Sequence, residues 1–106
     1  MSLFEDRERA IEAKFARDSE LDFRARVRAF RFLAVWASTL KGETVAQARE
    51  FARSMIHVDV RQIGDEDVVR IVRSYLGELT DEATVRRKMQ EFFRESKELL
   101  ELEKSL

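Results

Sequence analysis

Residues 19–40, SELDFRARVRAFRFLAVWASTL, decide the fold of this chain. Apolar residues recur in this stretch at the spacing of one helix face, at Phe23, Val27, Phe30, Ala34 and Ala37. Leu33, Trp36 and Leu40 widen the face beyond about 100°, which is typical of a helix that packs on a core. Ser19 suits the N-cap and Gly42 suits the stop. We therefore predict a helix of about 33 Å over residues 19–40, along which the rest of the chain folds.

The composition indicates a single all-helical domain. The chain has 106 residues, no proline, and glycine only at positions 42, 64 and 77, where we expect breaks between helices. The net charge of −1 provides no strong field to attract nucleic acid or an acidic membrane. No apolar run approaches 18 residues and no signal-peptide core is present, so we expect an intracellular protein without a membrane span. No cysteine is available for disulfides or thiolate–metal chemistry.

Three more helices are expected after residue 42. Thr44 and Gln47 form a capping box that opens the second, whose apolar face comprises Val45, Ala48, Phe51, Ala52 and Met55. Residues 58–63 alternate like a short strand, but a lone strand has no pairing partner, so an extended loop is favoured. Asp65 is expected to cap the third helix, with apolar residues Val68, Val69, Ile71, Val72, Tyr75 and Leu76. Gly77 ends that helix.

Thr80 or Asp81 is expected to cap the fourth helix. Its apolar side comprises Val85, Met89, Phe92, Ser96 and Leu99, broadened by Phe93, Leu100 and Leu102. Short connections favour antiparallel packing of consecutive helices. The expected fold class is all-α, a four-helix bundle-like domain over residues 19–106 with a flexible or helical N-terminal arm over residues 1–18.

The arm carries Phe4, Ile11 and Phe15 on one face, among charges of both signs. Only Asp18 and Ser19 interrupt the pattern, so the arm either frays or continues the next helix. Its apolar residues either pack back on the bundle or anchor the arm in a partner's groove. We favour the partner, with Arg7 and Lys14 among the flanking charges that contact it.

The residues suggest no enzyme. The chain lacks phosphate-binding glycine motifs, and spacing suggests no nucleophile–base pair. His57 has no companion ligand, so we expect no metal site and no cofactor. The carboxylates of Asp65, Glu66 and Asp67 are explained by their position at a helix start, where the helix dipole favours negative charge.

A basic cluster occupies the middle of the long helix. Arg24, Arg28 and Arg31 recur at helical spacing on the face away from the core, next to Arg26. A solvated face with salt bridges is the favoured interpretation, and these arginines are possible anion contacts. The alternative function is a nucleotide- or nucleic-acid-binding helical module. Self-association through the leucines of the fourth helix is a third possibility.

Several blocks of the sequence resemble one family. They are residues 4–15, FEDRERAIEAKF; Trp36-Ala37; residues 64–68, GDEDV; and residues 85–89, VRRKM, with a looser match over 41–63 in which Asp59 is clearest. With these blocks the chain resembles the zeta subunit of alphaproteobacterial F-type ATP synthases, a family first catalogued as a domain of unknown function.

The resemblance implies a four-helix regulatory subunit that inhibits ATP hydrolysis. It implies that the N-terminal segment, Phe4 to Phe15, inserts as a helix at a catalytic interface of the head, close to the rotor stalk. The implied partners are the alpha, beta and gamma subunits, with no nucleic acid and no membrane insertion. The implied location is cytoplasmic, peripheral at the inner membrane through the synthase. We expect a monomer when the protein is free.

Overall fold

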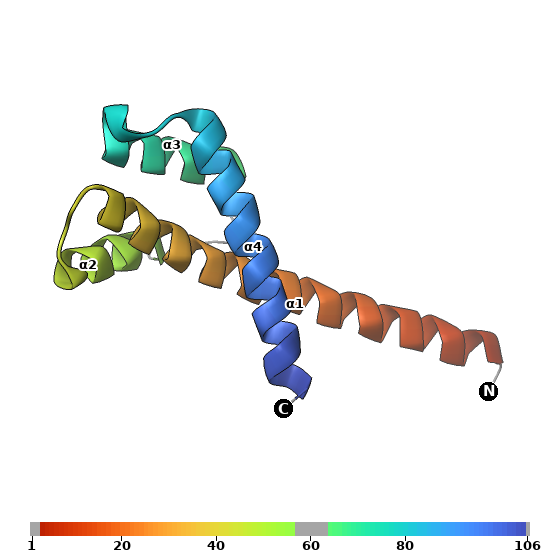
Figure 1. Ribbon diagram of the computed structural model, residues 1–106. Helices are drawn as coiled ribbons and strands as arrows, with labels where there is room; N and C mark the ends of the chain where they lie inside the picture. The colour runs from red at the N-terminus through yellow and green to blue at the C-terminus, as the bar shows by residue number, and fades with distance from the viewer. Residues whose placement is uncertain (1–2, 57–63, 106) are drawn as a thin grey trace.

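The computed structural model describes residues 3–56 and 64–105, which form four α-helices and one short 3₁₀ helix (Figure 1). The elements are α1 (Leu3–Leu40), α2 (Val45–Ile56), α3 (Asp65–Leu76), η1 (Gly77–Leu79) and α4 (Glu82–Ser105). The all-α prediction is confirmed. The expected loop at 58–63 and His57 lie outside the described residues.

Helix α1 runs without a break from the arm into the domain, so the prediction that Ser19 begins a helix is wrong. Neither glycine nor proline occurs between Leu3 and Leu40. A serine inside a helix costs only a few tenths of a kcal/mol relative to alanine, too little to stop it. The second expectation for the arm, that it continues the next helix, is therefore confirmed.

The predicted stop at Gly42 is confirmed. Gly42 has φ of 77°, a conformation that residues with a Cβ rarely adopt. Its N–H donates to the carbonyl of Thr39 at 3.0 Å, and the Glu43 N–H donates to the carbonyl of Ser38 at 2.9 Å. This hydrogen-bond pair is a Schellman motif. It reverses the chain within a few residues, so that α2 returns along the second half of α1 (Figure 1).

The remaining helix starts also depend on local sequence. The Thr44 N–H donates to Gln47 Oε1 at 2.9 Å and the Gln47 N–H donates to Thr44 Oγ1 at 3.2 Å, which confirms the capping box. Asp81 accepts from the Thr84 N–H at 2.7 Å and so caps α4. Asp65 is the first residue of α3 and does not cap it, because Gly64 occupies the N-cap position.

The core lies between the second half of α1, α3 and the first half of α4. Its buried members are Phe30, Leu33, Ala34, Ala37, Val68, Val69, Val72, Leu76, Val85 and Met89. Phe51 and Ala52 of α2 are half-buried against it. Four residues that were predicted on the core-facing sides of the helices are instead exposed: Leu40 by 43%, Val45 by 70%, Leu99 by 42% and Leu102 by 60%.

Small residues are buried where α4 crosses α1 (Figure 1). Ala25 and Ala29 of α1 are fully covered, as is Ser96 of α4. Small side chains at a helix crossing let the two backbones approach each other. Helices α1 and α4 are not consecutive, so the antiparallel packing predicted for consecutive helices does not concern them. Helix α4 lies across α1 (Figure 1).

The overall shape is elongated, with extents of 61 × 30 × 23 Å. The radius of gyration is 17.2 Å, whereas a compact chain of this length has about 13 Å. The 38 residues of α1 span about 57 Å, close to the longest dimension of the molecule. The excess size comes from the first half of α1, which projects from the domain (Figure 1).

Candidate functional site

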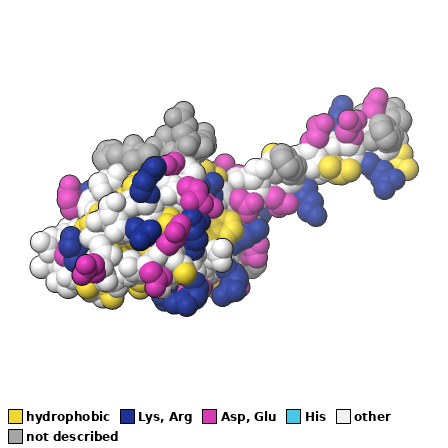
Figure 2. Space-filling view, turned by 90° about the horizontal axis from the view of Figure 1, so that it is seen from above, with side chains coloured by type: hydrophobic (Ala, Val, Ile, Leu, Met, Phe, Trp, Pro, Cys, Tyr) yellow, Lys and Arg dark blue, Asp and Glu magenta, His cyan; other side chains and the backbone are white. Residues whose placement is uncertain are grey.

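The arm projects into solvent as a bare helix. Every residue from Leu3 to Glu20 whose side chain the structure describes is exposed, and partial burial begins at Leu21. Figure 2 shows the arm as a narrow rod that leaves the domain and carries charged side chains of both signs together with apolar ones. None of the core residues that the structure describes comes from this half of α1. The described side chains of residues 3–20 therefore add little to the packing of the domain.

Two features of the sequence explain why the arm is helical without packing. Ala10, Ala13 and Ala16 have the highest intrinsic helix propensity, and Glu5 and Asp6 lie in the first turn, where the helix dipole favours carboxylates. The arm also extends a helix that the core already holds, so it avoids the cost of nucleating a new helix. It is consequently presented in the helical conformation.

The base of the arm is fixed by the second half of α4. Lys97 Nζ lies 3.0 Å from Asp22 Oδ1, and Arg28 Nη1 lies 2.9 Å from Glu103 Oε1. The hydrogen bond to Arg28 holds the pKa of the Glu103 carboxyl below its ordinary value, and the hydrogen bond to Asp22 raises the pKa of Lys97. Charge pairs therefore link α4 to α1 close to the residue where the arm leaves the domain.

The apolar residues of the arm are available for contact where the structure describes them. Ile11 is exposed by 68%. Leu3, which the sequence-based expectation missed, is exposed by 78%. The side chains of Phe4 and Phe15 lie outside the described residues. Arg7 and Lys14 of the predicted contact set are exposed on the same helix. Leu3 could have been recognised from the sequence as a further exposed apolar residue of the arm, because it directly precedes the predicted anchor Phe4.

The structure separates the three arginines that the sequence grouped together. Arg28 forms a two-pronged ion pair with Glu103, with its Nη2 at 3.3 Å from Oε2. Arg24 is exposed, in a hollow beside Leu100 and Glu103. Arg31 faces α2 and lines the groove between α1 and α2. Anion binding by all three together stays a prediction, and an anion at Arg28 would have to displace a carboxylate.

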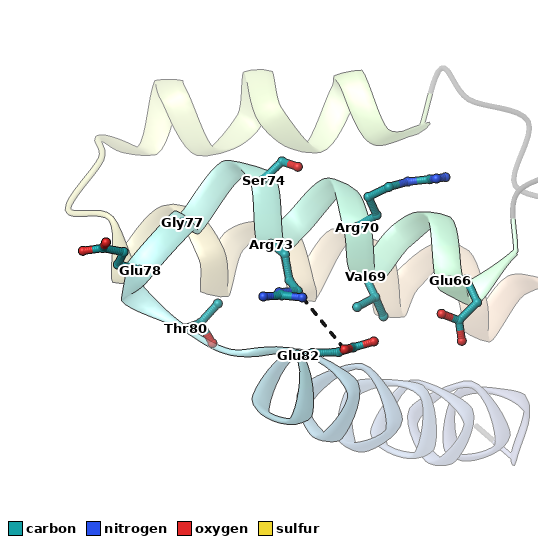
Figure 3. A pocket seen from close by; sticks show the side chains of 9 residues that line it. All are labelled: Glu66, Val69, Arg70, Arg73, Ser74, Gly77, Glu78, Thr80 and Glu82. Carbon is teal, nitrogen blue, oxygen red and sulfur yellow. Dashed lines mark ion pairs between the residues drawn. The ribbon is translucent and has the colours of Figure 1, made fainter.

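A polar hollow of about 670 Å³ lies between α3 and the start of α4 (Figure 3). It is lined by Glu66, Val69, Arg70, Arg73, Ser74, Gly77, Glu78, Thr80 and Glu82. The two arginines that line it are each paired with a carboxylate. Arg73 Nη1 lies 3.8 Å from Glu82 Oε2, and Arg70 pairs with Asp67. The hollow thus offers no unpaired basic group to a ligand.

Carboxylates at the start of α3 form ion pairs with arginines of other helices. Asp65 Oδ1 lies 3.0 Å from Arg26 Nη2, and Glu66 Oε2 lies 2.6 Å from Arg86 Nη2. The hydrogen bond from Arg86 lowers the pKa of the Glu66 carboxyl, which favours the ionised form. These carboxylates therefore serve as links between helices: Asp65 joins α3 to α1 and Glu66 joins α3 to α4.

The described residues provide neither a membrane span nor a metal site. None of the helices over 3–56 and 64–105 is both long and apolar enough to cross a membrane. Within the same ranges, His, Cys, Asp and Glu residues form no group of three that could hold a metal ion.

The chain matches a known protein family over most of its length. The family model described as ATPase inhibitor subunit zeta matches residues 1–98, which includes the arm, α1, α2, α3 and most of α4. No curated protein matches the chain. The family resemblance identified from the sequence is confirmed by this match.

Proposed function

This chain belongs to the ATPase inhibitor subunit zeta family, and on that premise we propose that its N-terminal arm is the element that inhibits ATP hydrolysis. The family description implies a regulatory role with no catalysis by this chain. The proposal assigns residues 1–18 as the inhibitory arm and residues 19–106 as the four-helix domain that presents it. The observation that carries the proposal is an exposed helix with apolar side chains that its own core does not use.

The arm's exposed apolar residues supply the binding energy. Fully burying a side chain such as Ile11 gives about 1.5–3 kcal/mol. Because the arm is already helical, less of this energy is spent on ordering it than for a disordered segment. We propose Phe4, Ile11 and Phe15 as the anchors in the partner's groove, with Arg7 and Lys14 as flanking contacts.

The mechanism is steric and conformational. The arm inserts as a helix at a catalytic interface between the alpha and beta subunits of the head, next to the gamma subunit of the central stalk. Bound there, it favours one rotational state of the head by its higher affinity for that state, and hydrolytic rotation stops. The domain fixes the orientation of the arm, because Asp22 and Arg28 form ion pairs with α4 near the base of the arm.

The proposed partner also sets the location. A subunit bound to the catalytic head is peripheral to the membrane that carries the synthase. In this proposal the protein is cytoplasmic, is monomeric before it binds, and contacts neither nucleic acid nor the lipid bilayer.

A matched pair of substitutions tests the proposal. Ile11→Asp places a charge on the arm's apolar surface, and Leu102→Asp does the same at an exposed leucine of α4; the two residues are exposed by 68% and 60%. We expect Ile11→Asp to raise the concentration that half-inhibits ATP hydrolysis by purified F-type ATP synthase about tenfold or more. Leu102→Asp should inhibit like the unmodified chain. Equal inhibition by both variants would refute the role of the arm.

A further inference from the structure

The second half of α1 and the length of α2 line a groove on the surface of the domain. Its volume is about 470 Å³. Along α1 it is lined by Arg31, Val35 and Thr39, and along α2 by Val45, Ala48, Arg49, Ala52 and Arg53, with Glu43 and Thr44 at the turn. Val35 and Val45 are exposed by 48% and 70%. The groove therefore has an apolar floor that is open to solvent.

The basic residues of this groove have no ion-pair partner among the residues that the structure describes. Elsewhere in the described chain most domain arginines are paired with a carboxylate, namely Arg26, Arg28, Arg70, Arg73, Arg86 and Arg87. Arg31, Arg49 and Arg53 are all exposed, and none has an ion pair within 3–56 and 64–105. The one acidic lining residue, Glu43, has Lys41 Nζ 3.6 Å from its carboxylate. The groove is therefore a surface of unbalanced positive charge.

We propose that this groove binds an acidic amphipathic helix of the ATP synthase, as a second contact besides the arm. The inference rests on the proposed function for its partner. Two antiparallel helices with apolar residues between them form a groove that can bind a third helix. The apolar side chains of that helix at i, i+3 or i+4, and i+7 enter the groove. Carboxylates flanking that stripe would meet Arg31 on one wall and Arg49 and Arg53 on the other.

The size of the groove limits the length of the bound segment. From Val45 to Arg53 α2 rises about 12 Å, and so does α1 from Arg31 to Thr39. A partner helix of about two turns fills this length.

The other possible occupants fit the groove less well. The arm of a second copy carries Arg7, Arg9, Lys14 and Arg17, so its charge is mixed and does not complement a basic groove. A single-stranded nucleic acid is bound by cations together with aromatic side chains that stack on its bases, and none of the described residues that line this groove is aromatic.

The test reverses one charge on each wall of the groove in the full chain. Arg31→Glu/Arg49→Glu is compared with Arg87→Glu/Arg94→Glu, which makes the same change of charge on exposed residues of α4. Co-sedimentation with purified F-type ATP synthase measures binding, and an ATPase assay measures inhibition. Circular dichroism melting checks that both variants are folded.

The expected result is about a tenfold or greater loss of affinity for the groove variant, with the control unchanged. At saturating concentration the groove variant should still inhibit fully, because its arm is intact. Its affinity should also depend less on salt than that of the unmodified chain.

Three results would overturn the inference. They are unchanged binding of the groove variant to the synthase, a concentration-dependent dimer that only this variant loses, and tight binding of polyuridylate that only this variant loses. Failure of the proposed function is distinct: there the unmodified chain binds the synthase without inhibiting it, or arm substitutions leave inhibition unchanged.

Discussion

The two halves of α1 have the same helical backbone and opposite environments. From Leu21 to Leu40 the helix supplies Phe30, Leu33, Ala34 and Ala37 to the core, whereas the described side chains from Leu3 to Glu20 are all exposed. The second half is held by packing and the first by intrinsic propensity and by continuity with the second. Helical structure therefore does not indicate which residues stabilise this protein. Burial does, and it divides one helix into a structural half and a half that is free to bind.

The largest expected effect comes from truncating the same kind of side chain in each half. Leu33 is fully buried, so Leu33→Ala should lower the free energy of unfolding by about 2–5 kcal/mol. The melting temperature should fall by about 10 °C or more. Ile11→Ala, the control in the arm, should change the free energy of unfolding by less than about 0.5 kcal/mol. Similar losses for the two variants, measured by thermal and urea unfolding, would remove the distinction between the halves.

A smaller effect on stability is expected at Gly42, in the turn that follows the C-terminal end of α1. Gly42→Ala puts a Cβ on a residue with φ of 77°, where the added carbon meets no described atom within 4 Å beyond its own residue and its chain neighbours. The cost is therefore backbone strain alone, about 1–2 kcal/mol. Urea unfolding measures it, and ATPase inhibition at saturating concentration should be unchanged. A loss of inhibition in a folded Gly42→Ala variant would show that the turn, and not only the arm, takes part in inhibition.

The smallest effect on stability is expected for the ion pairs between α4 and the base of the arm. Arg28 lowers the pKa of the Glu103 carboxyl in the folded state, so the pair stabilises the fold above the carboxyl's unfolded pKa. This stabilisation is lost as the pH falls through the lowered folded pKa, below about pH 4.5. Glu103→Gln should therefore flatten the acid side of the stability profile slightly. Glu98→Gln on the same helix is the control, and an equal change in both would argue against the pair.

Local features of the fold could be predicted from sequence because their causes lie within a few residues. The Schellman turn at Gly42 and the capping box of Thr44 with Gln47 depend on backbone and side-chain groups three to five positions apart. The cap at Asp81 is of the same kind. The prediction that Ser19 begins a helix was wrong because a residue suited to the N-cap marks a helix start only where the residues before it cannot be helical. Residues 3–18 are helical.

The contacts between helices could not be predicted in the same way. That Ala25, Ala29 and Ser96 are buried depends on where α4 crosses α1, which no periodicity of a single helix encodes. The same holds for the arginines, because the sequence placed Arg28 and Arg31 on one face but could not show that α4 approaches the first and α2 the second. The groove between α1 and α2 was missed for that reason.

Deletion of residues 1–18 tests most directly whether the exposed half of α1 inhibits ATP hydrolysis. Melting temperature and inhibition of ATP hydrolysis by purified F-type ATP synthase are measured on the same preparation. We expect a melting temperature within about 3 °C of that of the full chain, because the deletion removes none of the described core residues, together with loss of inhibition. A truncated protein that inhibits as well as the full chain, or one that no longer folds, would contradict it.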